Sequence, residues 1–477
     1  MRNLVSELVG TTSGIVNGLR IVVARPRARR ALGIGGWILC LSVLAVPIWL
    51  EMRTAWLQSH ILSAISAKLT FEVQQAPSAQ VRYPSAGPYD RRLGYTRLPV
   101  FQENLKTRGF DVRAQARPSW LLRSLSDLRL FAVYPAKSQA GLQLLDREGR
   151  ALFARQYPER VYQNFETIPA LIVDSLLFIE NRELLDATTP RRNPAVEWDR
   201  FVQAFRDVAL QPIRPAHSLS GGSTLATQLE KVRHSPGGRT ASPMEKLRQM
   251  TSASLRAYRD GEETMTARRQ IVCDYLNSLP LASQPGFGEV IGLGDGLWAW
   301  FGADFTAVNL LLGSPARQAP DQFLVERGIA YRQAVSLLLA IKKPSFYLRQ
   351  DWTALNRRVD VYLRLLSQAG VIPPTLRDAA LNVRLKVREQ APAAAPADFM
   401  GNKAADSIRA NLLGMLGLEG TYDLDRLDLT VRTTLDDSAN GAAARMLNQL
   451  SHPSHAIAAG LDLPPVTSSS HNLESSR

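Results

Sequence analysis

The segment GGSTLATQLEK at 221–231 combines residue types that can bind an anion. Its two glycines allow a backbone to approach a ligand closely, and Ser223 and Thr224 are residues that cap the start of a helix. The apolar spacing after them predicts an amphipathic helix, whose N-terminus would attract anions through its free N–H groups. Taken alone, such a pattern is more often an ordinary capped helix start than a binding site.

This segment resembles the second motif of glycosyltransferase family 51, which reads GGSTLTQQLVKN. That family is the glycosyltransferase domain of class A penicillin-binding proteins and of monofunctional peptidoglycan glycosyltransferases. The residues that match the motif in register are Gly221, Gly222, Ser223, Thr224, Leu225, Gln228, Leu229 and Lys231. Eight matched positions in one short segment make the resemblance specific.

The neighbouring segments resemble the same family in the same order. LQLLDREGRALFARQY at 142–157 resembles its lead-in hairpin, and IPALIVDSLLFIENREL at 168–184 resembles the helix of its first motif, EDxxFxxHxG. Later matches are RRQIVCDYLNSLPLA at 268–282, WFG at 300–302, AVSLLLAIKKPSFY at 334–347 and NRRVDVYL at 356–363. The resemblance therefore covers about 141–369, and a weaker one continues to 447.

The resemblance implies an inverting transfer that polymerises the lipid-linked disaccharide lipid II and releases undecaprenyl pyrophosphate. Glu180 matches the glutamate that acts as general base on the acceptor hydroxyl, and Gln249 occupies the position of the third-motif glutamate. Lys231 and Lys246 are expected to offset the charge of the leaving pyrophosphate. The substrate contacts that the resemblance implies come from Gly222, Ser223, Thr224, Gln228, Lys231, Lys246, Arg248 and Asn277.

Several positions depart from the family pattern. The aspartate, phenylalanine, histidine and glycine of the first motif are replaced by Asn181, Leu184, Ala187 and Thr189. The third-motif carboxylate is replaced by Gln249, and Glu245, one turn away on the same predicted helix, is a candidate substitute. The family resemblance implies a divalent cation, Mg²⁺ or Mn²⁺, which a neutral amide would hold less well than a carboxylate.

These departures leave two alternatives open beside the polymerase. The first is a catalytically weakened protein that binds lipid II or acts as a scaffold for other enzymes of cell-wall synthesis. The second is a glycan hydrolase, which would need two carboxylates flanking the glycosidic bond, whereas only Glu180 stands out in the sequence.

The elements that position these residues are expected to be mainly helical. Apolar residues recur at three- and four-residue spacing in 168–185, 223–233, 243–259, 265–279, 327–343 and 353–369. The expected architecture is a mainly α, lysozyme-like domain behind a transmembrane helix, with small β-containing segments before and after. Residues 96–135 are expected to form two or three strands, and LDLTVRTTLDDSANGAAARML at 427–447 a strand and then a helix.

Residues 31–50 are uncharged and predict a membrane anchor, since about 20 helical residues span a bilayer core. Five arginines between 20 and 30 precede this run, so the N-terminus is expected in the cytoplasm. The expected location is the bacterial inner membrane, with the main domain in the periplasm or outside the cell. A cleaved signal peptide is the competing interpretation, but its apolar core is usually shorter.

The predicted organisation has five parts: 1–30, a basic tail; 31–50, the anchor; 51–140, a linker and small module; 141–389, the glycosyltransferase domain; 390–477, a linker and a transpeptidase-like start. Neither SxxK nor KTG occurs in these 477 residues, so no serine transpeptidase is expected. The net charge of +14 favours anionic partners. With the family resemblance, these are lipid II, the glycan strand and the membrane, not nucleic acid; other cell-wall synthesis proteins are further candidate partners.

Overall fold

The computed structural model of the chain describes residues 46–131, 133–197, 223–313, 323–392, 399–450 and 452–460. The predicted mainly helical fold is confirmed, and it agrees with the lysozyme-like domain that the resemblance implies. The helices of the central domain are α7 (Ala170–Glu180), α9 (Leu225–His234), α10 (Pro243–Ala257), α11 (Met265–Ser278), α12 (Leu293–Phe301), α13 (Phe305–Gly313), α14 (Leu324–Ala340), α15 (Trp352–Gln368) and α16 (Pro374–Asn382).

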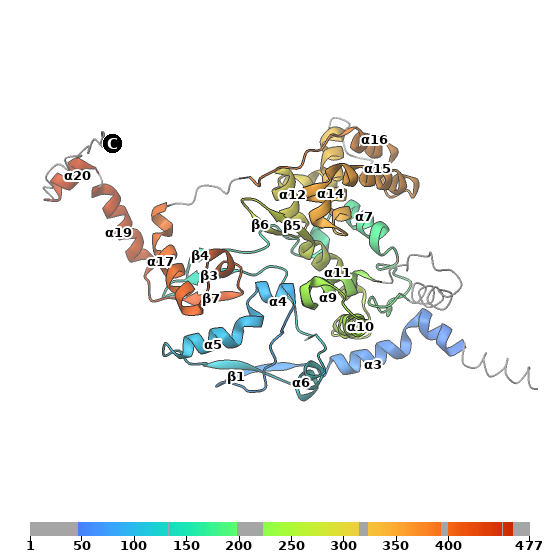
Figure 1. The fold of residues 1–477 in the computed structure, drawn as a ribbon, viewed down its shortest axis with the longest axis horizontal. Helices are drawn as coiled ribbons and strands as arrows, with labels where there is room; N and C mark the ends of the chain where they lie inside the picture. The colour runs from blue at the N-terminus through green and yellow to red at the C-terminus, as the bar shows by residue number, and fades with distance from the viewer. Residues whose placement is uncertain are drawn as a thin grey trace, which may run out of the picture.

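Helix α14 is the centre of this domain, with α12, α13, α15 and α16 packed around it (Figure 1). Its last two turns are buried on every side, as expected for a helix with an almost continuous apolar sequence. Helix α15 buries only one face, through Leu355, Val359, Leu363 and Leu366. That spacing produces an apolar stripe on a helix with 3.6 residues per turn, so sequence periodicity alone fixes which face packs inward.

Local signals in the sequence fix where the helices begin. The Ser242 hydroxyl accepts a hydrogen bond from the Glu245 backbone N–H at 3.1 Å, and Pro243 occupies the first position of α10. Asp351 caps α15 in the same way, accepting from the Ala354 N–H at 2.8 Å. Both caps satisfy donors that the first turn of a helix leaves without a partner.

The segment before the central domain is a small αβ module. It contains α3 (Trp56–Ser66), β1 (Phe71–Gln75), α4 (Pro88–Arg92), α5 (Leu98–Lys106), β2 (Ala114–Pro118) and α6 (Trp120–Asp127). Strands β1 and β2 pair antiparallel, with Phe71 opposite Pro118. The prediction of two or three strands in 96–135 was therefore wrong in part, because one strand and two helices form there.

A second hydrophobic core joins distant parts of the sequence. Strand β3 (Leu142–Leu145) pairs antiparallel with β4 (Ala151–Ala154), as predicted for the lead-in hairpin, and parallel with β7 (Leu429–Arg432). Helices α5 and α17 (Phe399–Leu416) cover this sheet, burying Phe101 and Leu412 with Leu142 and Leu144. The sheet thus connects segments on both sides of the predicted boundary at 389.

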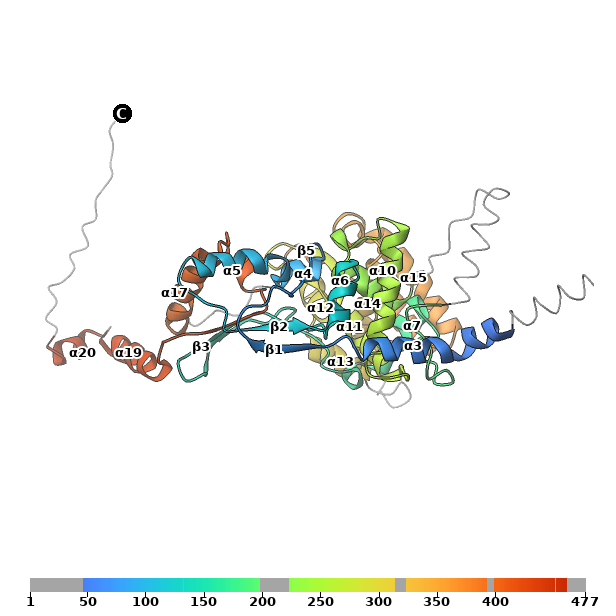
Figure 2. The ribbon, with the colours of Figure 1, turned by 90° about the horizontal axis from the view of Figure 1, so that it is seen from below.

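The remaining elements are a hairpin, a short helix and two helices near the C-terminus. Strands β5 (Pro280–Gln284) and β6 (Gly288–Ile291) form a hairpin beside α12, and α18 (Thr421–Leu424) precedes β7. Helices α19 (Asp437–Leu450) and α20 (Pro453–Ala458) extend away from the rest, as Figures 1 and 2 show. The predicted strand followed by a helix at 427–447 is confirmed by β7 and α19.

Within the described part of the chain, none of the helices has the length and apolar character needed to cross a bilayer. Most of the predicted anchor, 31–45 of 31–50, lies outside the residues that the structure describes. The anchor therefore stays a prediction.

Candidate active site

Glu180 is the last residue of α7, and its carboxylate is half-buried where the helix ends. The Gln228 side chain on α9 donates from Nε2 to Glu180 Oε2 at 3.0 Å. The Tyr275 hydroxyl on α11 donates to Gln228 Oε1 at 3.2 Å. A row of hydrogen bonds therefore connects three segments that are far apart in the sequence: 168–184, 221–231 and 268–282.

Thr224 begins helix α9, as its residue type predicts. Its side-chain oxygen accepts from the Thr227 backbone N–H at 3.2 Å, and Thr224 itself is buried. Ser223, one residue earlier, accepts a hydrogen bond from Lys246 Nζ at 2.8 Å. The ammonium group of Lys246 on α10 is thereby held at the N-terminus of α9, beside Thr227 Oγ1 at 3.3 Å.

Two lysines supply positive charge close to Glu180. Burial lowers the pKa of Lys231, and the nearby Glu180 carboxylate partly opposes that change. Burial, with repulsion from Lys231, lowers the pKa of Lys246 to about 8. Lys246 is thus a poorly compensated cation, which an anionic ligand would stabilise.

A cavity of about 640 Å³ opens beside this cluster. Gln228, Lys231 and Tyr275 line one side of it. The other side comes from residues 341–350, which include the exposed Lys342 and Lys343 and the aromatic Phe346. None of the described residues that line it is acidic, so the cavity is a basic cleft suited to an anion.

Sequence reasoning did not assign Lys342 and Lys343 to the site. The sequence signal for these two lysines is weak. The lysine pair in AIKKPSFY directly follows the buried helix α14, and basic residues at the end of a helix are equally well explained by solvent exposure and the helix dipole. Arg239 also lines the cavity.

Glu180 and Lys246 are not among the residues that line the cavity, although Glu180 is bonded to Gln228, which does line it. Other predicted residues lie further away. Gln249 is buried, and its amide donates to Ser235 Oγ at 2.9 Å and to Thr240 Oγ1 at 3.0 Å. Asn277 is buried as well, with its amide bonded to the backbone N–H and C=O of Tyr162 at 2.9 and 2.8 Å. Both amides are used in internal contacts, and neither residue lines the cleft.

Arg248 and Glu245 form an ion pair at 3.3 Å on α10. Both line a separate cavity together with Asp90 and His234, so Glu245 does not take the place of a second carboxylate in the cleft. Arg233 is buried and paired with Asp274 at 3.1 Å. Gly222, the remaining predicted contact, lies outside the described residues.

The loop after Glu180 is held by buried polar side chains. Asn181, which replaces the family's aspartate, accepts from the Leu225 N–H at 3.4 Å and donates to Glu197. Arg268 on α11 is fully buried and donates to four backbone carbonyls of this loop, at distances of 2.8 to 3.3 Å: those of Leu184, Asp186, Thr189 and Pro190. The departures at 181–189 thus lie in a well-supported loop.

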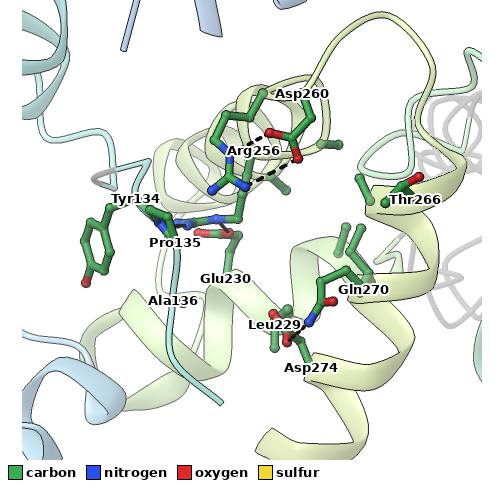
Figure 3. A pocket seen from close by; sticks show the side chains of 16 residues that line it. Tyr134, Pro135, Ala136, Leu229, Glu230, Arg256, Asp260, Thr266, Gln270 and Asp274 are labelled. Atoms are coloured by element: carbon green, nitrogen blue, oxygen red, sulfur yellow. Dashed lines mark hydrogen bonds and ion pairs between the residues drawn. The ribbon is translucent and has the colours of Figure 1, made fainter. Parts of the chain in front are cut away.

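The opposite face of α9 is also polar, and its charged side chains pair within the protein. Figure 3 shows a second cavity there, of about 350 Å³, where Glu230 contacts Arg256 and Gln270 contacts Asp274. The Arg256 Nε to Glu230 Oε1 distance is 2.7 Å. Burial acts to raise the pKa of Glu230, but the attraction of Arg256 and His234 outweighs it, so that the pKa is lowered. This face fixes α9 to α10 and α11, leaving Gln228 and Lys231 directed to the basic cleft.

A divalent cation is the cofactor that the family resemblance implies. Mg²⁺ and Mn²⁺ prefer carboxylate and carbonyl oxygens as ligands. Among the described residues, no group of three or more histidine, cysteine, aspartate or glutamate side chains comes together to hold a metal ion. Among the described residues that line the cleft, lysines and Arg239 supply the positive charge.

Comparison with known families agrees with this geometry. Residues 148–366 match the family model described as Transglycosylase. These residues belong to the glycosyltransferase 51 family, whose members include the glycosyltransferase domain of class A penicillin-binding proteins. The match supports a glycosyltransferase role in peptidoglycan synthesis for this segment. A search of curated proteins found no match.

Proposed function

We propose that the chain polymerises lipid II into glycan strands by an inverting transfer. Glu180 removes the proton from the 4-hydroxyl of the acceptor disaccharide as this oxygen attacks the anomeric carbon of the growing chain. The bond from that carbon to undecaprenyl pyrophosphate breaks, and the electron pair leaves with the pyrophosphate. A positioned carboxylate is a suitable general base for this step.

The lysines of the cleft stabilise the charge that develops on the leaving group. Lys231 lines the cavity and interacts electrostatically with Glu180, and Lys246 is close enough to Lys231 for the two charges to repel. Lys342 and Lys343 extend the positive charge to the other side of the cavity. Fixed cations at the place where charge develops need no rearrangement during the reaction, which is why such sites are effective.

One observation carries the proposal. Gln228 connects the candidate base, Glu180, to Tyr275 and lies on the same helix face as Lys231 at the edge of the cleft. The proton acceptor and the cations for the leaving group are therefore adjacent, as a single displacement step requires.

The second candidate function is a protein that binds lipid II without polymerising it. The internal use of the Gln249 amide favours it, because the position of the third-motif carboxylate contributes nothing to the described cleft. A hydrolase is less well supported, since the described lining of the cleft holds no carboxylate to act opposite Glu180.

An assay of the purified full chain with labelled lipid II separates these functions. Formation of glycan polymer supports the polymerase, and binding without turnover supports the scaffold. Shortening of preformed glycan strands supports the hydrolase. The polymerase proposal is rejected if lipid II is bound but remains monomeric under conditions in which a known polymerase is active.

We further propose that residues 31–50 anchor the chain in the inner membrane with residues 51–477 on the outer side. The arginines before the anchor support this orientation. Protease added to spheroplasts should digest the part after residue 50 and leave a short membrane-bound N-terminal fragment. Full protection of the chain until the cells are lysed would contradict this orientation.

A further inference from the structure

Arginine and tyrosine side chains alternate in a stack outside the candidate active site. The Arg92 guanidinium on α4 lies 5.7 Å from the Tyr89 ring centroid and 5.6 Å from that of Tyr157. The Arg426 guanidinium lies 4.2 Å from the Tyr157 centroid and 3.5 Å from the Tyr422 centroid. Aromatic faces attract guanidinium groups and leave their N–H donors available for another partner.

This stack borders a cavity of about 370 Å³ where four parts of the chain meet. Four arginines line the cavity: Arg91, Arg92, Arg97 and Arg426. Two acidic residues, Glu289 and Asp423, also line it, so the formal charge of its described lining is four positive minus two negative, or +2. The cavity therefore has an excess of guanidinium groups.

Within the described part of the chain, none of these four arginines has a carboxylate within ion-pair distance. Arg97 donates to the Gly417 carbonyl at 3.1 Å, and Arg426 donates to the carbonyls of Tyr422 and Phe287 at 3.0 and 3.4 Å. The Nε atoms of Arg92 and Arg426 are buried without a hydrogen-bond partner. Buried charged donors in this state are costly, and an anion relieves the cost.

The pKa of Arg92 points in the same direction as the geometry. Burial lowers it, and the attraction of Glu289 compensates only in part. Guanidinium groups stay charged in proteins, so Arg92 is a half-buried cation that its own protein does not neutralise.

We propose that this arginine cavity binds a phosphate-class dianion, such as pyrophosphate or the phosphate of a larger ligand. A lining with a formal charge of +2 is matched better by the charge of a dianion than by the single charge of one carboxylate. Planar guanidinium groups bind phosphate oxygens in pairs, and the volume accommodates more than one phosphate group. Gly237 lines both this cavity and the basic cleft, so the two sites are neighbours across one turn.

The site can be tested by calorimetric titration of the full chain with inorganic pyrophosphate. Arg426→Gln should weaken one binding site by about tenfold or more, the typical loss when a hydrogen-bonding partner of a charged group is removed. Arg92→Gln should do the same. Arg384→Gln, a change at an exposed arginine outside the cavity, should leave affinity unchanged. Circular dichroism would verify that each variant is folded.

Two further experiments separate this site from the proposed active site and identify the source of the phosphate. Lys231→Gln should leave the Arg426-dependent site intact, whatever it does to polymerisation. Sedimentation with phosphatidylglycerol vesicles, compared with phosphatidylcholine vesicles, tests a lipid headgroup as the source. Loss of vesicle binding in Arg426→Gln, when the wild-type protein does not bind pyrophosphate, would support that source. The proposal is overturned if neither probe depends on Arg426 and Arg92, or if succinate binds there as tightly as pyrophosphate.

Discussion

Gln228 is placed to orient the proton acceptor of the cleft. Its amide donates to Glu180 and accepts from Tyr275, so each end of the side chain has a fixed partner. Glutamine can do this because one side of its amide donates and the other accepts. A carboxylate at the end of a helix has rotational freedom, and Gln228 restricts it.

Replacing Gln228 with leucine should therefore slow glycan polymerisation by about tenfold or more, because a hydrogen bond to a charged group is lost. Initial rates with labelled lipid II would measure the effect. Gln270→Leu, a change at an exposed glutamine on α11, is the matched control and should keep the wild-type rate. Equal rates in both variants would show that Gln228 does not position Glu180.

The lowered pKa of Lys246 predicts how anion binding depends on pH. With a pKa of about 8, Lys246 is charged below that pH and becomes neutral as the pH rises through it. Affinity for pyrophosphate bound beside Lys246 should therefore decrease between about pH 7 and pH 9. An anion bound beside Lys246 should also raise its pKa, because it favours the charged form.

Titrations with pyrophosphate at several pH values would measure this dependence. In Lys246→Met the decrease centred near pH 8 should disappear, and binding at low pH should be weaker than in the wild-type protein. A wild-type decrease that persists unchanged in Lys246→Met would assign the titration to another group.

At the scale of the elements, α9 and α11 connect the candidate base to the core. Helix α11 carries Tyr275, which contacts the site, and Arg268, which holds the loop that follows Glu180. Because Arg268 satisfies four carbonyls at once, it replaces the water that an exposed loop would bind.

Arg268→Met should lower the free energy of unfolding by about 3 kcal/mol, since several buried carbonyls lose their donor. Urea denaturation would measure the change. Arg269→Met, at the exposed neighbouring position, should change stability by less than about 0.5 kcal/mol. Similar losses in both variants would contradict the role assigned to Arg268.

The helices that could be predicted from the sequence are those whose apolar spacing is clear within the helix itself. The apolar spacing in 243–259 and 353–369 acts within a few residues, so local rules located the helices α10 and α15. The helix α5 was missed because its buried Phe101 packs on α17, about 300 residues later. Lys342 and Lys343 were missed for the same reason: tertiary packing, not local pattern, brings them to the cleft.

At the scale of the whole molecule, the two hydrophobic cores differ in how far apart their segments lie in the sequence. The first surrounds α14 and lies mostly, though not wholly, within the matched segment 148–366, because it also includes residues of α16. The second joins α5, β3 and α17 from three separate regions of the sequence. The parallel pairing of β3 with β7 means that the hairpin entering the domain depends on residues far downstream. No local signal predicts a parallel partner at such a distance.

Leu144→Ala, in the second core, should cost about 2–5 kcal/mol, because Leu144 is fully buried. Hydrogen exchange should show a loss of protection in both α5 and α17, while α14 stays protected. Leu338→Ala, a matched change in the first core, should do the reverse. Uniform loss of protection in both variants would show that the two cores unfold as one unit.

The most direct test of the proposed mechanism compares Glu180→Gln with Glu183→Gln in the lipid II polymerisation assay. Glu183 is exposed three residues further along the chain and serves as the control. If Glu180 is the general base, Glu180→Gln should reduce polymer formation by about 100-fold or more, with unchanged thermal stability, and Glu183→Gln should behave as the wild type. Polymerisation by Glu180→Gln at the wild-type rate would contradict the assignment of Glu180 as the base.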